Sequence, residues 1–363
     1  MKAAVCRAFG KPLQIEELTL AAPSWGEVKV KLAACAICHS DITFMDGGWG
    51  GTLPMVLGHE AAGVVTETGP GVADIKLGDH VLVTLLRSCG HCHDCAKGEP
   101  FICSTPFPAD GDSRIREADG APVVQGLKTG GFAEEVVVDQ SQAVAIPDDV
   151  PLDAASLLSC GVITGLGAVI NTAKVEMGAS VVVIGCGGVG LNSVQGAALV
   201  NASPIIALDL VESKLAAAKN FGATHLINPA LTNAESEVRR LTNGRGADYV
   251  FVAAGSPKAF EQGLELLAPS GTLVIVGMPP TGQKIAVEAG NVAGASQKII
   301  GSKMGSTRLK SDIPKLVALY KEGRLKLDEL ISGRYPIQEI NTAIDEVRAD
   351  HALRNVIIFG EPS

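Results

Sequence analysis

The sequence predicts an α/β protein with two domains, a doubly wound parallel sheet and a mainly β domain. Its 363 residues are 47% hydrophobic, which is ample for two buried cores. From about residue 178 to 301, short apolar runs alternate with helix-like segments, as in a doubly wound sheet. Residues 1 to about 80 instead hold short β-type runs, at 28–32, 61–65 and 80–83, which indicates a compact β body.

Charge and composition argue against several function classes. The net charge of −9, without a basic run that carries interleaved aromatic residues, disfavours nucleic-acid binding. No uninterrupted apolar run reaches membrane-spanning length, and the first residues lack the features of a signal peptide, so we expect a cytoplasmic protein without membrane contact. Nine cysteines in so large a chain point to metal rather than to disulfides.

A glycine-rich turn, GCGGVG at 185–190, follows the apolar run 181–184 and leads into a helix-like segment. Gly185 makes the turn, Gly187 lets the backbone approach a pyrophosphate, and Gly190 lets helix and strand pack closely. Such a turn often only joins a strand to a helix, but its context favours a dinucleotide site in a Rossmann-type domain. The residues expected to line it are Gly185, Gly187, Gly188, Val189 and Gly190.

Asp209 ends the second apolar run, 205–208, nineteen residues after Gly190. A carboxylate at this position accepts hydrogen bonds from an adenosine ribose. It would repel a 2′-phosphate, and Leu210 and Val211 offer no arginine to receive one. The sequence therefore predicts NAD rather than NADP as the coenzyme.

Four closely spaced cysteines predict a structural zinc site. Two, two and seven residues separate Cys89, Cys92, Cys95 and Cys103, so their thiolates can wrap one tetrahedral ion and leave no open position for chemistry. An iron–sulfur cluster and fortuitous clustering are the alternatives, although the run lacks the Cys-Pro ending of bacterial ferredoxins. We interpret the histidines inside this lobe, at 91 and 93, as solvated loop residues.

Cys38, His59 and Cys160 form a candidate catalytic zinc site. A catalytic zinc needs three protein ligands and a fourth position open to water or substrate, and a Cys₂His set meets that need. Spacing alone supports equally well two small buried cysteines and a structural histidine. Glycines and polar residues around 38–41 and 58–60 predict loops, where functional residues often lie.

Several segments in order resemble the zinc-containing medium-chain alcohol dehydrogenases over essentially the whole chain. They are CHSD at 38–41, GHEAAG at 58–63, the four-cysteine lobe, CGVITGLGAV at 160–169, GCGGVG at 185–190 with Asp209, VGMPP at 276–280 and LRNVIIF at 353–359. The resemblance implies a GroES-like catalytic domain at 1–161 and 304–363, with the structural zinc lobe at 89–103, and an NAD-binding Rossmann domain at 162–303. It also implies two zinc ions per chain, one catalytic and one structural.

The resemblance assigns roles beside the catalytic zinc. Asp41 would hold His59 in its metal-binding tautomer, and Ser40 would take the proton from the alcohol. Glu60 would coordinate the zinc transiently, and Arg354 would pair with Glu60 and contact the coenzyme. Without the resemblance, Ser40 and Asp41 could cap a helix, and Glu60 and Arg354 could form a surface pair.

The resemblance also implies coenzyme contacts outside the glycine turn. They would come from His39, Thr164, Lys214, Val276 and Met278. The chain departs from the family's pattern twice. His39 replaces an arginine that many relatives place on the pyrophosphate, and Thr43 replaces a histidine that passes the proton to solvent, so the relay would end in water, a ribose hydroxyl or another group.

By resemblance, Trp49, Leu85 and Met278 would line the substrate pocket. The pocket would then be apolar, which favours primary, allylic or aromatic alcohols over polyols. The predicted reaction is reversible hydride transfer between such an alcohol, or a secondary one, and NAD, in a cleft between the domains. The polar stretch 104–128 is predicted to be a long surface excursion. Because the longer, often dimeric members of the family have a comparable stretch, the resemblance favours a homodimer over a tetramer.

Three other functions remain open at this stage. Close relatives oxidise the thiol adduct of formaldehyde, and Arg114 and Arg116 could anchor such an anionic adduct. A nicotinoprotein would keep its coenzyme bound and exchange hydride between two substrates. A silent NAD-binding relative would carry no activity, although the complete zinc set argues against this.

Overall fold

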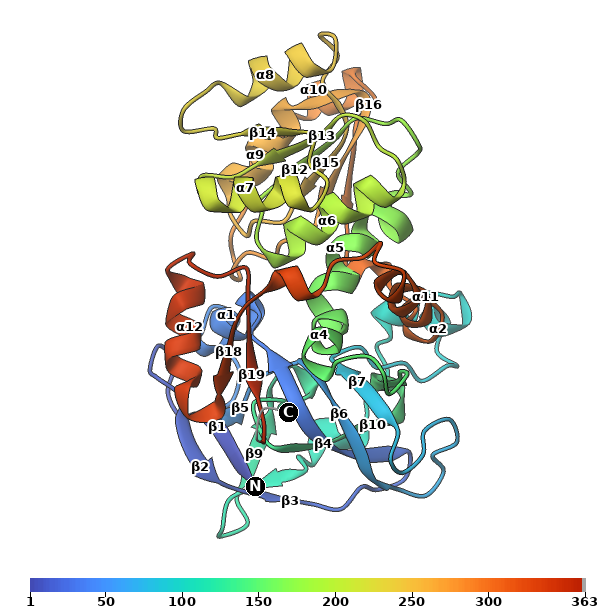
Figure 1. Ribbon diagram of the computed structural model, residues 1–363, viewed down its shortest axis with the longest axis vertical. Helices are drawn as coiled ribbons and strands as arrows, with labels where there is room; N and C mark the ends of the chain where they lie inside the picture. Colours follow the sequence, from blue (N-terminus) through green and yellow to red (C-terminus); the bar gives the residue numbers. More distant parts are fainter. Residues whose placement is uncertain (361–363) are drawn as a thin grey trace. The chain divides into compact units, whose positions relative to one another are not determined.

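The computed structural model describes residues 1–360, and the chain divides into two compact units (Figure 1). The first unit comprises Met1–Cys160 and the chain from Arg308 onward, and the second comprises Gly161–Thr307. The divisions fall one residue before and four residues after the boundaries expected from the sequence. Each unit has its own sheets and its own hydrophobic core.

A seven-stranded sheet forms the centre of the first unit, in the order β11-β7-β6-β4-β19-β18 with β10 also on β4. The long strand β4 pairs with β10 over residues 27–31 and with β19 over residues 34–36. The three predicted β runs lie within β4, β6 and β7, so the mainly β body is confirmed. The strands are β4 Glu27–Ala36, β6 Glu60–Thr68, β7 His80–Thr84, β10 Glu135–Asp139, β11 Ala143–Ala145, β18 Ile331–Pro336 and β19 Arg354–Ile358.

The stretch 104–128 is not a mere surface excursion, as the sequence suggested. It contributes β8 and β9 to a second sheet in the order β2-β1-β5-β9-β8-β3, where Ile115 and Val123 are fully buried. Its polar residues turn outward or pair, while these two apolar side chains join the core. The strands are β1 Lys2–Cys6, β2 Gln14–Glu17, β3 Thr19–Leu20, β5 Met55–Val56, β8 Ile115–Arg116 and β9 Pro122–Gln125.

The second unit is the predicted doubly wound domain. Its six strands are all parallel, in the order β14-β13-β12-β15-β16-β17, and helices pack against the sheet (Figure 1). The strands are β12 Val181–Ile184, β13 Ile205–Leu208, β14 His225–Ile227, β15 Ala247–Val252, β16 Leu267–Ile275 and β17 Lys298–Gly301. The helices are α6 Gly188–Leu199, α7 Glu212–Asn220, α8 Ala234–Leu241, α9 Pro257–Glu265 and α10 Ala289–Gly294.

An apolar helical run, Leu152–Ala173, is the one described segment long and apolar enough to cross a membrane. Within its most apolar window, 89% is buried inside the fold, which is typical of a core helix. It consists of α4 Leu152–Leu157, the π-helical turn η4 Leu158–Val162, α5 Ile163–Gly167 and the π-helical turn η5 Ala168–Ala173. The π-helical turn η4 carries Cys160, and such turns are frequent at functional sites.

The remaining helices of the first unit are short, apart from two near the end of the chain. The short ones are α1 His39–Met45, α2 His93–Ala96 and α3 Pro108–Gly111. The two longer ones, α11 Leu309–Lys321 and α12 Ile340–Arg348, match the amphipathic segments expected from the sequence.

A buried ion pair ties the second sheet to the central one. The guanidinium of Arg114 donates to both carboxylate oxygens of Glu27 at 3.0–3.1 Å, and the two side chains are 9% and 5% exposed. Arg114 also pairs with the exposed Asp112 at 3.2 Å, and Asp112 is the ion-pair partner of Arg116, next but one along the chain. Removing one partner of a buried pair leaves the other charge without compensation in the core.

Arg114→Met is therefore expected to destabilise the first unit by about 3–5 kcal/mol, since Glu27 would stay buried and unpaired. Both tryptophans of the chain, Trp25 and Trp49, lie in this unit, so their fluorescence in urea reports its unfolding alone. Arg116→Met is the matched control and should cost less than about 1 kcal/mol, because its pair is exposed. Equal midpoints for the two variants would contradict this assignment.

Candidate active site and metal centres

Cys38 lies at the start of a helix, not in a loop as the sequence suggested. It is the N-cap of α1, its sulfur accepts from the backbone N–H of Ser40 at 3.5 Å, and the carboxylate of Asp41 accepts from the Cys38 N–H at 3.1 Å. This reciprocal capping box fixes the direction of the Cys38 side chain. Cys38 and Asp41 have the N-cap and N3 spacing of a capping box, so the sequence carries a signal for this helix start.

The carboxylate of Asp41 also orients His59. Its Oδ1 accepts from the Gly58 N–H at 2.9 Å and lies 3.0 Å from His59 Nδ1, and both side chains are buried. This assigns the proton to Nδ1 and leaves Nε2 as the metal-binding nitrogen. Burial alone would lower the pKa of His59, but the charge and hydrogen bond of Asp41 raise it well above its ordinary value.

Cys160 reaches the same place from the π-helical turn η4. The neighbouring Ser159 donates its hydroxyl to the carbonyl of Ala61 at 3.0 Å, which anchors the turn beside the beginning of β6. The ligand atoms of Cys38, His59, Glu60 and Cys160 all lie within 4.8 Å of one another, and all four residues are buried. Ser159 had no signal in the sequence, since its partner is 98 residues away.

Glu60 and Arg354 form a buried pair rather than a surface one. Their side chains are 0% and 5% exposed, and the Arg354 guanidinium donates to Glu60 Oε2. Strand register brings them together, because Ala36 of β4 pairs with Glu60 on one side and with Val356 of β19 on the other. Burial raises the pKa of Glu60 to about 7, against the opposing charge of Arg354.

These residues fit a zinc ion. Two sulfurs and one imidazole supply three ligands and leave a fourth position for water or substrate. His59 Nε2 and Glu60 Oε1 are buried without a hydrogen-bond partner among the described residues, and such atoms are costly unless something binds them. The hydrogen bond with Cys160 lowers the pKa of Cys38 well below its ordinary value, which favours the thiolate that metal binding requires.

The other predicted residues of the first unit lie on or near α1. Ser40 is half-buried on its first turn, and His39 is exposed beside it. The hydroxyl of Thr43 donates to the carbonyl of His39 at 2.9 Å, so it is engaged within the helix. Trp49 meets the ring of Phe44 edge to face, with centroids 5.2 Å apart. Leu85, predicted to line the pocket, is half-buried just after β7.

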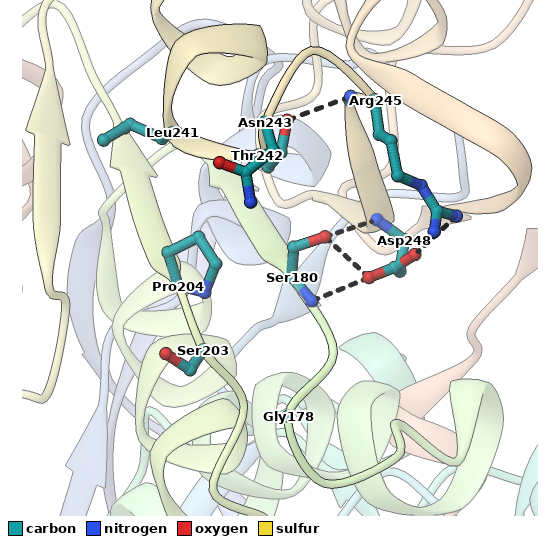
Figure 2. Close-up of a pocket in the computed structure, with 10 residues that line it drawn as sticks. Gly178, Ser180, Ser203, Pro204, Leu241, Thr242, Asn243, Arg245 and Asp248 are labelled. Carbon is teal, nitrogen blue, oxygen red and sulfur yellow. Dashed lines mark hydrogen bonds and ion pairs between the residues drawn. The ribbon is translucent and has the colours of Figure 1, made fainter.

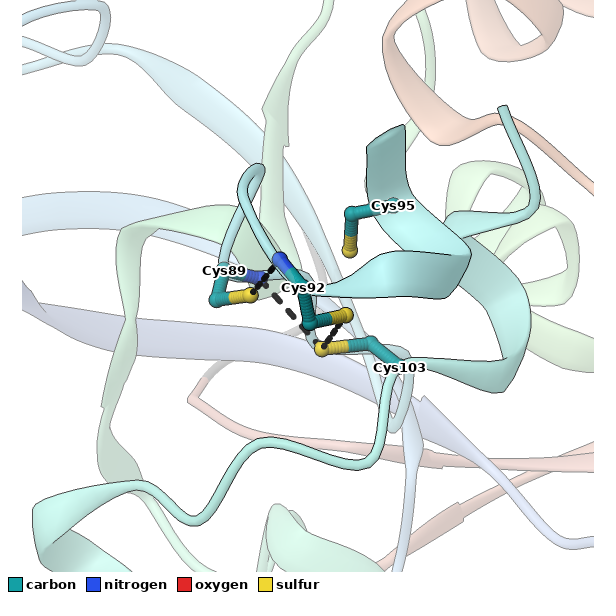
Figure 3. Close-up of side chains that lie close together, drawn as sticks. All are labelled: Cys89, Cys92, Cys95 and Cys103. Carbon is teal, nitrogen blue, oxygen red and sulfur yellow. Dashed lines mark hydrogen bonds between the residues drawn. The ribbon is translucent and has the colours of Figure 1, made fainter. Parts of the chain in front are cut away.

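The four-cysteine lobe brings its four sulfurs together, as predicted for a structural metal site (Figure 3). The sulfurs of Cys89, Cys92, Cys95 and Cys103 lie within 4.8 Å of one another, with Cys95 on helix α2. Backbone N–H groups of Cys92 and Cys89 donate to the sulfurs of Cys89 and Cys103 at 3.3 and 3.4 Å. His91 is exposed and its Nδ1 lies 2.8 Å from the Cys89 carbonyl, so its ring is not part of this set.

The glycine turn of the second unit has the steric features of a dinucleotide site. A Cβ on Gly190 would lie 1.7 Å from the Gly185 carbonyl oxygen, so only glycine allows this contact between helix and strand. A Cβ on Gly187, by contrast, would meet no atom within 4 Å. The backbone there borders open space at the N-terminus of α6, where a pyrophosphate could accept from helix N–H groups.

Asp209 lies at the carboxyl end of β13, as expected. Its carboxylate accepts from the backbone N–H groups of Cys186 and Val211 at 2.6 and 2.9 Å, which links it to the glycine turn. A carboxylate offers about four acceptor positions, so two remain for the hydroxyls of a ribose.

The remaining predicted coenzyme residues also lie in the second unit. Lys214 is buried rather than a solvated charge, and the hydroxyl of Thr164 donates to the sulfur of Met304 at 3.6 Å. Val276 is buried, whereas Met278 is 64% exposed.

A polar pocket lies at the end of the parallel sheet that is opposite the glycine turn (Figure 2). Ser180 directly precedes β12, and its N–H and hydroxyl both donate to the carboxylate of Asp248 in β15. The pocket therefore borders the amino ends of these strands, and its polar groups bond to one another. Because dinucleotides bind at the carboxyl ends of parallel strands, this pocket is not the coenzyme site.

Known proteins resemble the chain along its whole length. Residues 24–148 match the family model described as alcohol dehydrogenase GroES-like domain, and residues 188–322 match the one described as zinc-binding dehydrogenase. The chain is 37% identical to an alcohol dehydrogenase class-3 of Cereibacter sphaeroides and 36% identical to an S-(hydroxymethyl)glutathione dehydrogenase of Paracoccus denitrificans, each over 99% of both chains. The structure of benzyl alcohol dehydrogenase from Acinetobacter calcoaceticus superposes with a TM-score of 0.93 at 32% identity, over 99% of both chains.

Asp41→Asn should weaken zinc binding at the buried site by about 10- to 100-fold, because the neutral amide no longer stabilises the oriented imidazole. Competition against a chromophoric chelator would measure this, with one of the two metal ions affected. Asp46→Asn, at the other end of α1 and paired with Arg348 on the surface, is the matched control. Equal zinc affinity in Asp41→Asn and wild type would refute the role of Asp41.

Replacing the two glycines by alanine should have different effects. Gly187→Ala should melt like wild type, since its Cβ meets nothing in the protein, yet bind NADH about tenfold more weakly or worse. Gly190→Ala should instead lower the melting temperature, because the Gly185 carbonyl must move. Fluorescence titration with NADH and thermal melting separate the two effects, and unchanged NADH affinity in Gly187→Ala would argue against this binding site.

Proposed function

The chain belongs to the zinc-containing medium-chain alcohol dehydrogenase family and is an NAD-dependent zinc alcohol dehydrogenase, and we propose that it acts on neutral primary, allylic or aromatic alcohols. The observation that carries this proposal is the buried set of Cys38, His59 and Cys160, in which Asp41 orients His59 and the Nε2 of His59 has no hydrogen-bond partner among the described residues. A silent relative would have no need to maintain such a set.

The bound groups supply the difficult chemistry: zinc lowers the pKa of a hydroxyl, and the nicotinamide exchanges hydride with the substrate carbon. Cys38, His59 and Cys160 would hold the catalytic zinc, and the four-cysteine lobe a second, structural one. The glycine turn and Asp209 would hold the coenzyme. Glu60, whose carboxylate lies within 4.8 Å of the other ligand atoms and pairs with Arg354, would coordinate the catalytic zinc transiently.

Ser40 would take the proton from the substrate hydroxyl. It lies on the first turn of α1, two residues after Cys38, and is half-buried. Because the hydroxyl of Thr43 already donates to the carbonyl of His39, the proton would pass from Ser40 to water or to a ribose hydroxyl of the coenzyme.

The side chains expected around the substrate are apolar. Trp49 and Leu85 of the first unit offer no partners for the extra hydroxyls of a polyol, whose burial would leave polar groups unsatisfied. Trp49 packs on Phe44, which supports an aromatic wall suited to allylic or benzylic groups. The similarity to a benzyl alcohol dehydrogenase supports the same substrate class.

Oxidation of the glutathione adduct of formaldehyde is the second candidate, because one of the most similar relatives bears that activity in its name. The two arginines that the sequence offered as anchors for its carboxylates do not support it. Arg114 is buried against Glu27, and Arg116 donates to Asp112 and to the Gly120 carbonyl. Both guanidinium groups already bind groups of this chain, so we favour a neutral alcohol as the substrate.

We further propose that the enzyme works in the cytoplasm as a homodimer that exchanges its coenzyme at each turnover.

The direct test of the function is a screen that follows NADH absorbance with benzyl, allyl and aliphatic alcohols, and with formaldehyde in the presence and absence of glutathione. Turnover of benzyl or allyl alcohols that is faster than turnover of aliphatic alcohols supports the proposal. A requirement for glutathione would establish the second candidate, and coenzyme retained through desalting would indicate a nicotinoprotein.

Ser40→Ala should lower kcat by about 100-fold or more when chemistry limits the rate, since general-base assistance is lost. The dissociation constant of NADH should stay unchanged. Thr43→Ala, on the same helix, should remain within a few-fold of wild type. If Ser40→Ala turns over like wild type under conditions that show a deuterium isotope effect, Ser40 does not transfer the proton.

A further inference from the structure

A threonine hydroxyl contacts the metal-binding cluster of the four-cysteine lobe. Thr105, two residues after Cys103, donates from Oγ1 to the sulfur of Cys89 at 3.1 Å. That sulfur also accepts from the backbone N–H of Cys92 at 3.3 Å, so two donors converge on one ligand atom. Donors aimed at a thiolate form charge-assisted hydrogen bonds, which are stronger than neutral ones.

The loop that carries Thr105 is fastened at its far end by a buried arginine. Arg87 lies two residues before Cys89, and its side chain is 3% exposed. Its guanidinium lies over the ring of Phe107, 4.5 Å from the centroid, and pairs with Asp110. Asp110 in turn accepts from the Phe107 N–H at 3.0 Å. The segment before the first cysteine is thus linked to the segment after the last.

We propose that Thr105 is a positioning residue of the structural zinc site, and that Arg87 keeps the loop of Thr105 closed over Cys89. The inference rests on the proposal that this lobe binds zinc, but not on the alcohol dehydrogenase activity. The hydroxyl fixes the position of the Cys89 sulfur and stabilises its thiolate form, which metal binding requires. Partners of this kind typically change metal affinity by about 10- to 100-fold.

The test compares Thr105→Val, which removes the hydroxyl at nearly constant shape, with Thr105→Ser, which keeps it. Both are made in the full chain and loaded with zinc or with cobalt. Thr105→Val should release one of its two zinc ions to excess chelator about tenfold faster than wild type and release the other at the wild-type rate. The sulfur-to-cobalt charge-transfer band in the difference spectrum should move to lower energy, because the Cys89 sulfur loses a donor.

Thr105→Ser should restore both the release rate and the charge-transfer band, and Ser104→Val, at the exposed neighbouring position, should change neither. Arg87→Met should accelerate release of the same ion as Thr105→Val. An unshifted band and unchanged release in Thr105→Val would overturn the inference. A wild-type chain that binds only one zinc ion would overturn its premise as well, whereas alcohol turnover would still be measured independently at the catalytic site.

Discussion

The candidate catalytic site depends on the hydrogen bonds that the carboxylate of Asp41 accepts. It accepts from the N–H of Cys38, the N–H of Gly58 and the imidazole of His59, all within 3.1 Å. One buried charge therefore caps a helix, fixes the loop before β6 and sets a histidine tautomer. Asp41 can both cap the helix and orient His59, because one carboxylate has enough acceptor positions for the two roles. The charge of Asp41 also raises the pKa of His59, against the lowering effect of burial.

The same principle of shared groups governs the second unit. The carboxylate of Asp209 holds the glycine turn through the Cys186 N–H and still has acceptor positions to offer a ribose. Gly190 permits close packing that no side chain allows, while Gly187 leaves room for a ligand. In both units, the residues that shape the backbone are also residues that we propose to hold or orient the cofactor. For substitutions at these positions, both the stability of the protein and its affinity for the cofactor must therefore be measured.

Local patterns made much of this predictable. The glycine turn, Asp209 and the four cysteines are short motifs whose spacing fixes their geometry, and β4, β6 and β7 follow from apolar runs. Contacts across long sequence distances were not predictable from the residues alone. Arg114 reaches Glu27 87 residues away, Arg354 reaches Glu60 294 residues away, and Ser159 anchors the π-helical turn of Cys160 on β6. The stretch 104–128 looked like a surface loop because its polar residues outnumber Ile115 and Val123, the two that enter the core.

We infer that Cys38, His59 and Cys160 together hold a metal ion in the first unit. Diffraction from crystals of the zinc-loaded protein, measured on either side of the zinc absorption edge, would locate this ion. We predict an anomalous peak bonded to the sulfurs of Cys38 and Cys160 and to Nε2 of His59, besides a peak within the four-cysteine lobe. A map with zinc in the lobe and none among Cys38, His59 and Cys160 would rule out this metal site.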